Sequence, residues 1–324
     1  MNRHIKGLLF WGGALAIIFV FLRNRPFWIY LIWIFAWGGL IQVSDLLVHG
    51  WKRRKNKTGK PIGSLDPRLD TPLKARFASL NYLISNFLFL FNPFILAQCC
   101  LQIVGTFWER FNGNPVWQAE RYKHKVNYIL PVAGEWRVYN GGITRETSHS
   151  WGIPTQRYAY DLVKFGENGR SFNGNGRKLT DYFCYDAPIL APADGVIVKA
   201  RDGMHDAPFV GTFWMDCLAR NIAGNTVLIK HADGEYCLLA HLRRGSVCVK
   251  AGQTVKQGQE IGRCGHSGNS SEPHLHFQFQ NGKGFYFSSG LPVKFSRFWR
   301  RNGDARSFVE QDYISKGTFV ANGE

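Results

Sequence analysis

The six residues 272–277, EPHLHF, contain the most informative pattern in the sequence. Side chains two positions apart on a β-strand point to the same side, so His274 and His276 are expected to present two imidazoles to one cleft. Leu275 and Phe277 would then pack behind them. A single histidine is usually a hydrogen-bonded structural residue, but two on one face of a strand indicate metal or catalytic chemistry.

Two more side chains fit such a site. His241 ends the apolar run 235–240, and Asp161 follows the apolar run 158–160. Together with the histidine pair, they offer the nitrogen and carboxylate ligands that a catalytic zinc ion needs, with one position left open for water.

Short apolar runs separated by turn residues surround these side chains. Between residues 126 and 287 the runs are rich in β-branched and aromatic residues, and Gly, Asn and Asp separate them. No stretch of this region has a strong helical period. The pattern therefore predicts an all-β, mainly antiparallel domain.

The first 110 residues have a different composition. The runs 7–22 and 27–43 are apolar and carry no charge, and each is slightly shorter than the ~20 residues that span a bilayer. A second run follows the first at once and no small-residue cleavage pattern is present, so we expect two transmembrane helices rather than a signal peptide. A third apolar stretch, 80–108, contains several Asn, Gln and Ser residues. It is either a third spanning helix with its polar atoms facing other helices or a helix lying in the membrane interface.

Charge is concentrated near these apolar runs. The chain has 40 Lys and Arg against 23 Asp and Glu, and residues 1–110 hold 14 of the former and 4 of the latter. Basic residues cluster at 52–57, a pattern that sets membrane topology and keeps such a loop in the cytoplasm. No recognition motif accompanies the charge, so we expect no nucleic-acid partner. Five of the seven cysteines lie in the second half, an odd number that excludes a fully disulfide-paired domain.

Several motifs, in order, resemble those of the lysostaphin-type zinc metallopeptidases, also called peptidase family M23 or LytM-like, which cut peptides in bacterial cell walls. The matching segments are Tyr160-Asp161, LAPADGVI at 190–197, GNTVLIKH at 224–231, AHL at 240–242, VKAGQTV at 249–255, GHSGNS at 265–270 and PHLHF at 273–277. The resemblance extends from about residue 134 to residue 287.

The resemblance assigns roles to individual residues. It implies that Asp161 and His276 bind zinc, and that His241 and His274 are catalytic histidines that deprotonate water and stabilise the tetrahedral intermediate. The family usually places its first zinc histidine four residues before the aspartate, where this chain has Arg157, which cannot bind a metal ion. We therefore expect His149, the nearest histidine upstream, to be the third ligand.

The expected organisation has four parts. Residues 1–110 form a membrane region with two or three transmembrane helices, 111–133 a connector, 134–290 the M23-like domain and 291–324 a basic C-terminal tail. The resemblance implies a membrane-anchored zinc endopeptidase that cuts peptidoglycan stem peptides or cross-bridges. Because that substrate lies outside the cytoplasm, the domain is expected on the extracytoplasmic side of the cell membrane, which favours three crossings.

Two other functions are consistent with the same residues. A catalytically inactive LytM-like scaffold could regulate other wall hydrolases; Arg157 favours it, and the retention of the other four site residues argues against it. A peptidase acting on a secreted protein would use the same catalytic groups. Three helices exceed what an anchor requires, which leaves room for a membrane partner. We also expect His266 to hydrogen-bond its own loop rather than bind a metal.

Overall fold

The computed structural model describes residues 80–81, 84–85, 87–112, 118–167, 169–212 and 214–323. All of them belong to one compact unit. The apolar runs 7–22 and 27–43 and the basic cluster 52–57, on which the two expected transmembrane helices and their topology depend, lie outside the described residues.

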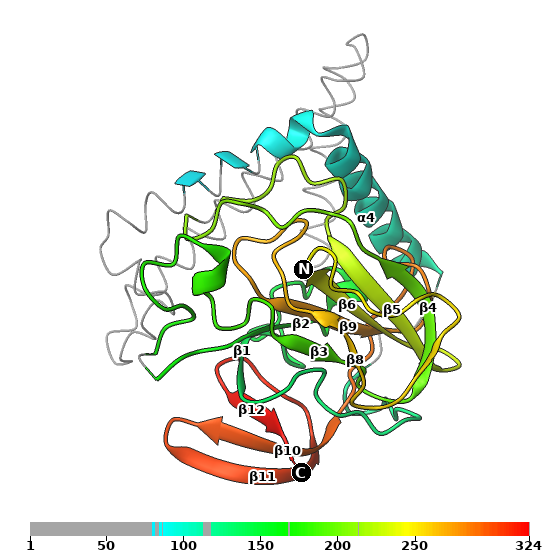
Figure 1. Cartoon of the computed structure of the whole chain (residues 1–324). Coiled ribbons are helices and arrows are strands. Elements are labelled where there is room, and N and C mark those ends of the chain that lie inside the picture. Colours follow the sequence, from blue (N-terminus) through cyan, green and yellow to red (C-terminus); the bar gives the residue numbers. More distant parts are fainter. Residues whose placement is uncertain are drawn as a thin grey trace, which may run out of the picture. The chain divides into compact units, whose positions relative to one another are not determined.

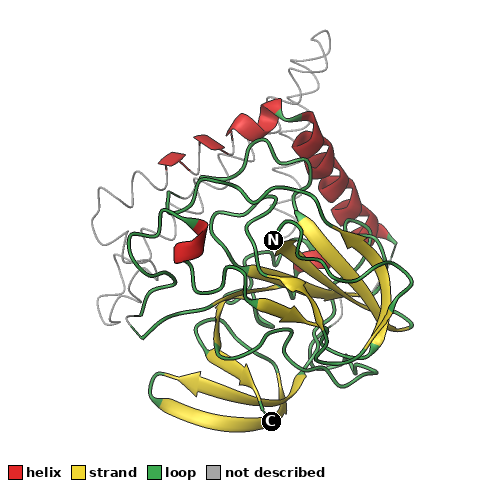
Figure 2. Cartoon of the chain, in the orientation of Figure 1, coloured by secondary structure: helices red, strands yellow, loops and turns green. Residues whose placement is uncertain are grey.

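A ten-stranded sheet dominates the described residues (Figures 1 and 2). Its order is β11-β10-β12-β1-β2-β9-β6-β5-β4-β7, and β3 and β8 pair separately. All of the strand pairs are antiparallel, so the expectation of a mainly antiparallel β domain is confirmed. The strands are β1 (Trp136–Asn140), β2 (Tyr160–Val163), β3 (Pro188–Leu190), β4 (Gly195–Arg201), β5 (Asn225–Ala232), β6 (Glu235–Leu242), β7 (Thr254–Val255), β8 (Glu260–Arg263), β9 (Leu275–Gln280), β10 (Phe295–Asn302), β11 (Ala305–Asp312) and β12 (Phe319–Asn322).

Strand β9 shows why the centre of the sheet holds both the core and the site. Its residues alternate between apolar and polar side chains, and all of them are buried. Leu275, Phe277 and Phe279 belong to the main hydrophobic core, where each contributes about 1.5–3 kcal/mol by burial. His276, Gln278 and Gln280 point to the opposite face. One face of β9 therefore stabilises the fold while the other carries polar groups.

The C-terminal stretch 291–324, expected to be a basic tail, contributes three strands to the same sheet. β12 pairs with β1, and β10 lies between β11 and β12. Its cations make specific contacts: Arg301 lies over the Phe319 ring, 3.9 Å from the centroid, and forms an ion pair with Glu135. These residues extend the sheet beyond β1, the neighbour of β2.

The third apolar stretch forms helix α4 (Pro93–Phe111), preceded by the short 3-10 helix η2 (Phe89–Phe91). The Asn92 side chain caps the start of α4 by accepting hydrogen bonds from the amides of Phe94 and Ile95. The Asn92 amide also donates to the carbonyls of Cys217 and Ala219 in the β domain. α4 is therefore attached to the domain from its first turn.

The sequence left 80–108 open between a third spanning helix and a helix in the membrane interface, and the contacts of α4 bear on this choice. The polar side chains of α4 form hydrogen bonds with the β domain, as Asn92 does, rather than with neighbouring membrane helices. In the part of the chain that the structure describes, no helix is both long enough and apolar enough to cross a membrane. Two further 3-10 helices, η3 (Pro154–Gln156) and η4 (Leu179–Asp181), lie in loops of the β domain.

Candidate metal and catalytic site

The pairing of β2 with β9 brings the first two predicted ligands together. Asp161 on β2 lies opposite His276 on β9, and His276 also lies opposite Ala240 on β6. Both side chains are buried, and Nδ1 of His276 is 2.9 Å from Oδ1 of Asp161. Sheet register, rather than a flexible loop, therefore sets the separation of these two groups.

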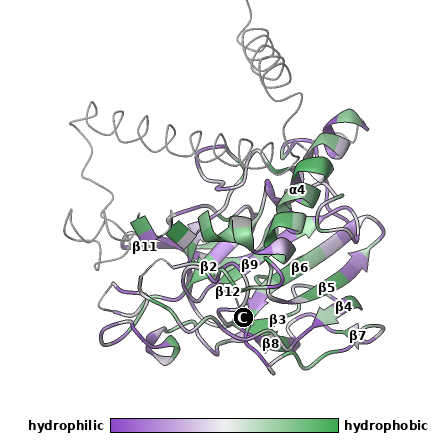
Figure 3. Ribbon diagram, turned by 90° about the horizontal axis from the view of Figure 1, so that it is seen from above, coloured by the Kyte–Doolittle hydropathy of each residue, from purple (hydrophilic) through white to green (hydrophobic). Residues whose placement is uncertain are grey.

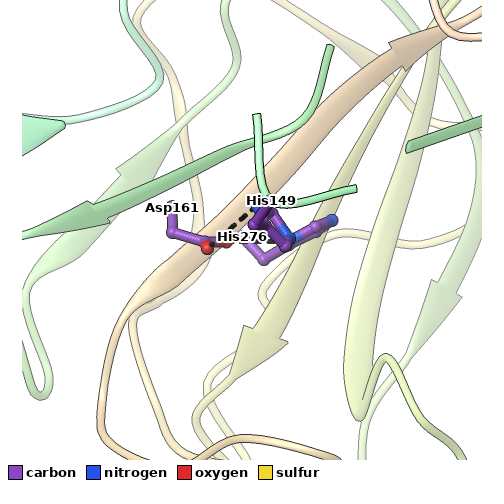
Figure 4. A group of neighbouring side chains, drawn as sticks. All are labelled: His149, Asp161 and His276. Carbon is purple, nitrogen blue, oxygen red and sulfur yellow. Dashed lines mark hydrogen bonds and ion pairs between the residues drawn. The ribbon is translucent and has the colours of Figure 1, made fainter. Parts of the chain in front are cut away.

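His149 reaches the same point from the loop between β1 and β2. Its Nδ1 is 3.6 Å from Oδ2 of Asp161, and the side chain is partly exposed. The donor atoms of His149, Asp161 and His276 all lie within 4.8 Å of one another (Figure 4). The structure thus brings together the three residues that the sequence predicts as metal ligands.

Arg157, at the position where the family has its first ligand, holds this loop in place. The Ser148 hydroxyl donates a hydrogen bond to the Arg157 carbonyl, and the Arg157 guanidinium donates to the Trp151 carbonyl. The guanidinium also lies 4.9 Å from the centroid of the Trp151 ring. These contacts fold the loop back on itself so that His149 returns to Asp161.

The two predicted catalytic histidines lie beside this group. Nδ1 of His241 is 2.8 Å from the Ser267 carbonyl, and Nδ1 of His274 is 2.8 Å from the Glu272 carbonyl. Because a carbonyl only accepts, each Nδ1 is the donor, and in the neutral ring Nε2 keeps its lone pair. The two rings are 4.7 Å apart, and Nε2 of His274 is 3.7 Å from Oδ1 of Asp161. His241 has a left-handed backbone with φ of 59°, which is uncommon for a residue other than glycine.

The electrostatics of the site separate these groups by charge. Burial lowers the pKa of His241 well below its usual value and also lowers the pKa of His274. Burial alone would raise the pKa of Asp161, but the surrounding imidazoles outweigh it and hold that pKa well below its usual range. At neutral pH the site therefore combines the ionised carboxylate of Asp161 with the neutral imidazoles of His241 and His274.

A chain of buried amides orients His276. Its Nε2 is 3.3 Å from Oε1 of Gln278, whose Nε2 donates to Oε1 of Gln280 at 2.8 Å. The Gln280 amide donates in turn to the Gly282 carbonyl. We did not predict these residues from the sequence, although their alternation after His276 places them on the same face of the strand.

This arrangement provides a test of whether a metal fits. When Nε2 of neutral His276 donates to Gln278, its Nδ1 lone pair faces a carboxylate oxygen of Asp161 at 2.9 Å. Two facing acceptors require a shared cation, either a proton or a metal ion. Consistent with the proton, burial alone would lower the pKa of His276, but the hydrogen bond and charge of Asp161 together with the hydrogen bond to Gln278 raise it. The donor set of two imidazoles and one carboxylate suits zinc.

A cavity of about 100 Å³ opens beside the site. Asp161 and His274 line one part of it, together with Asn140, whose amide donates to Oδ2 of Asp161 at 3.0 Å.

His266 lies in the loop after β8, is fully buried and shares a hydrogen bond with the Ser270 hydroxyl. The prediction that His266 bonds its own loop is confirmed.

Comparison with known proteins identifies the fold family. Residues 177–287 match the model of peptidase family M23. The chain contains a peptidase family M23 domain. The matched range includes His241, His274 and His276, whereas His149 and Asp161 lie upstream of it. The geometry above is therefore the evidence that connects these two residues with the M23 domain.

Three relatives share this M23 domain. The cell division protein DipM of Caulobacter vibrioides is 41% identical over 119 residues, which cover 37% of this chain and 16% of the relative. An uncharacterized metalloprotease of Haemophilus influenzae is 34% identical over 162 residues, which cover 48% of this chain and 30% of the relative. The peptidoglycan DD-endopeptidase ShyC of Vibrio cholerae is 35% identical over 101 residues, which cover 31% of this chain and 19% of the relative. This chain thus spans less than a third of the length of each.

Proposed function

We propose that this protein is a membrane-anchored zinc metallo-endopeptidase that hydrolyses peptide bonds in peptidoglycan stem peptides or cross-bridges. The observation that carries the proposal is the convergence of His149, Asp161 and His276, whose donor atoms lie within 4.8 Å of one another. The M23 domain supports the reaction class, and the DD-endopeptidase among the relatives supports peptidoglycan as the substrate.

His149, Asp161 and His276 would hold the zinc ion through two nitrogens and one carboxylate oxygen. When bound, zinc polarises the scissile carbonyl and lowers the pKa of a coordinated water toward ~7. Asp161 contributes the negative charge of the ligand set, and Asn140 fixes the orientation of its second oxygen. Gln278 fixes the ring of His276 from behind.

His241 and His274 would perform the proton transfers. Both are neutral at pH 7 because burial lowers the pKa of each, so each Nε2 can accept a proton from the attacking water. The imidazolium that results can donate to the oxyanion or to the departing amine. The Ser267 and Glu272 carbonyls accept from the Nδ1 atoms and keep both rings in the required tautomer.

The experiment that tests this proposal uses the full-length protein in detergent with isolated peptidoglycan, with and without a chelator. Mass spectrometry of the released fragments should show new peptide termini, and the chelator should abolish their release. His241→Ala and His274→Ala should each lower the rate about 100-fold or more. His124→Ala, remote from the sequence motifs, is the matched control and should retain full activity.

Failure of this experiment would redirect the proposal in a defined way. A folded, zinc-loaded protein that releases no fragment would contradict the endopeptidase and favour the regulatory scaffold or a protein substrate. A folded protein that neither binds zinc nor releases fragments would mean that His149 does not complete the site.

The membrane anchor and the extracytoplasmic placement are part of the same proposal, and the charge-free runs 7–22 and 27–43 support the anchor. The expected substrate, peptidoglycan, lies outside the cytoplasm, and this supports the extracytoplasmic placement. A topology reporter fused after residue 324 should report the extracytoplasmic side, and a cytoplasmic signal would contradict the placement.

A further inference from the structure

Helix α4 turns its polar side toward the protein, the reverse of an ordinary surface helix. The residues that face the β domain recur at the spacing of one helical face: Ile95, Gln98, Gln102, Gly105 and Glu109. Gln98 makes three hydrogen bonds there, two to the backbone of residues 220 and 222 and one to the Tyr286 hydroxyl. Buried Glu109 accepts from the Ser289 hydroxyl.

Most of α4 is hydrophobic (Figure 3), and large apolar side chains are exposed on its outward side. Its exposed large side chains recur at the same helical spacing and include two aromatic residues in the last turn. Trp108 is 55% exposed and Phe111 is 83% exposed. The exposed apolar residues of this face and of the segment before it are Phe87, Phe91, Phe94, Leu101, Ile103, Val104, Phe107, Trp108 and Phe111. A soluble monomer rarely exposes so many contiguous apolar side chains.

Three observations identify a lipid bilayer as what covers this face. First, the two charge-free apolar runs 7–22 and 27–43 precede α4 in the same chain and would bring it to a membrane. Second, the polar side chains of α4 are already bonded to the domain, so the outward face brings almost no polar group into an apolar medium. Third, cations flank the face: Arg110 lies in the last turn of the helix, and Arg220 lies over the Phe94 ring.

We propose that the outward face of α4 lies in the interface of the bilayer, with its apolar side chains buried about 5–10 Å into the boundary between headgroups and acyl chains. Trp108 and Phe111 lie at the end that carries Arg110, which is the arrangement expected at a membrane–water interface. The other occupant that could cover such a face, a second copy of the chain, is an outcome of the test below. The proposal concerns lipid contact and does not rest on peptidase activity.

The same helix contacts the loop that carries His149. Gln102, on the inward face, accepts a hydrogen bond from Gln156 at 3.4 Å, and Gln156 ends η3 in that loop. The backbone of η3 is tied to the domain through Pro154, whose carbonyl accepts from the amide of Gly290. An α4 that rests on the bilayer would therefore keep the metal-site loop close to the membrane surface.

The test uses the full-length protein and vesicles of phosphatidylcholine and phosphatidylglycerol in which one acyl chain carries a diazirine. The protein is floated with the vesicles and illuminated, and adducts are mapped by mass spectrometry. Lipid adducts on the outward residues of α4, such as Leu101, Val104 and Trp108, are the expected result. Phe308 on β11, also an exposed aromatic residue, is the internal control and should carry no adduct.

A variant separates lipid contact from general adhesion to vesicles. Val104→Glu places a charge on the outward face and should reduce labelling of 93–111 at least tenfold, whereas Phe308→Glu should leave it unchanged. The proposal is overturned if the protein does not float with vesicles, or if it floats and 93–111 carries no lipid adduct. Protein–protein cross-links at these positions, in place of lipid adducts, would identify a second copy as the occupant. Peptidase activity measured in the same preparation reports on the proposed function separately.

Discussion

Asp161 and His276 face each other across two paired strands, with Oδ1 and Nδ1 2.9 Å apart. Neither side chain needs a loop to reach the other, because the register of β2 and β9 fixes both. The third member, His149, depends on a loop closed by the hydrogen bond from Ser148 to the Arg157 carbonyl. The two halves of the site should therefore respond differently to mutation.

His149→Ala removes one of the three proposed zinc ligands. We expect bound zinc to fall from one ion per chain to nearly none, as measured by elemental analysis after dialysis. Ser148→Ala removes the hydrogen bond to the Arg157 carbonyl that closes the loop, and also the bond that the hydroxyl accepts from the Ser150 amide. It should weaken zinc affinity while retaining one ion at saturation. His124→Ala is the matched histidine control. Full zinc content in His149→Ala would show that this residue is not a ligand.

Gln278 is a positioning residue, since it contacts the ring of His276 from the side away from Asp161. Gln278→Leu removes the acceptor and should weaken zinc affinity by about 10–100-fold. Gln278→Glu keeps an acceptor at the same place and should restore most of that affinity. Competition with a chromophoric chelator measures both. Gln311→Leu, on exposed β11, is the control. Equal affinities for the Leu and Glu variants would show that the hydrogen bond does not orient the ring.

His266 predicts a dependence of stability on pH. Burial lowers its pKa to about 3, from an ordinary value of about 6.5. Between these two values the unfolded chain binds a proton that the folded chain does not, so stability falls as pH falls. The loss should approach about 1.4 kcal/mol per pH unit over this window.

The variant His266→Asn isolates this contribution, because the other histidines titrate in both proteins. Denaturant titrations at pH 6.5, 5.5 and 4.5 should show that the wild type loses stability relative to the variant at each step. A difference that does not change with pH would mean that His266 is protonated in the folded protein. No such difference is expected above pH 7, where His266 is neutral in both states.

Gly105 allows α4 to approach the β domain closely. A Cβ at this position would lie 1.9 Å from the Tyr286 carbonyl oxygen. Gly105→Ala should therefore loosen the docking of α4, although alanine stabilises an isolated helix by about 1 kcal/mol relative to glycine. Hydrogen exchange of the amides of 93–111 should become several-fold faster. Gly152→Ala, where a Cβ meets nothing within 4 Å, is the control. Unchanged or slower exchange in Gly105→Ala would contradict this packing.

The sequence was most informative where side-chain alternation and chemistry coincide. The alternation in 274–277 predicted both a strand and a pair of histidines on one face. His276 lies on β9, whereas His274 immediately precedes the strand, and both rings have a nitrogen within 3.7 Å of Oδ1 of Asp161. The apolar runs between turn residues predicted the antiparallel domain for the same reason. The position of His149 could not be predicted from spacing alone, because the contacts of Arg157 and Ser148 that fold its loop are not visible in the sequence.

Other parts of the structure could not be predicted because hydropathy does not say what an apolar side chain contacts. The stretch 80–108 was apolar enough to suggest a membrane-spanning helix, yet its few polar residues form one face that bonds to the β domain. The stretch 295–302 reads as basic, and its arginines concealed the alternation of a strand. The amides of Gln278 and Gln280 have no sequence signature of their own.

The backbone of His241 has one further consequence. A left-handed φ of 59° disfavours a branched or bulky side chain, and such strain costs on the order of 1–3 kcal/mol. Glycine and asparagine adopt this conformation more readily. Anyone who ranks variants of this protein by melting temperature would therefore be drawn toward Gly or Asn at 241, and would discard an imidazole of the site in the process. At this position thermal robustness and the proposed hydrolysis are opposing design goals, and an engineering campaign must score them separately.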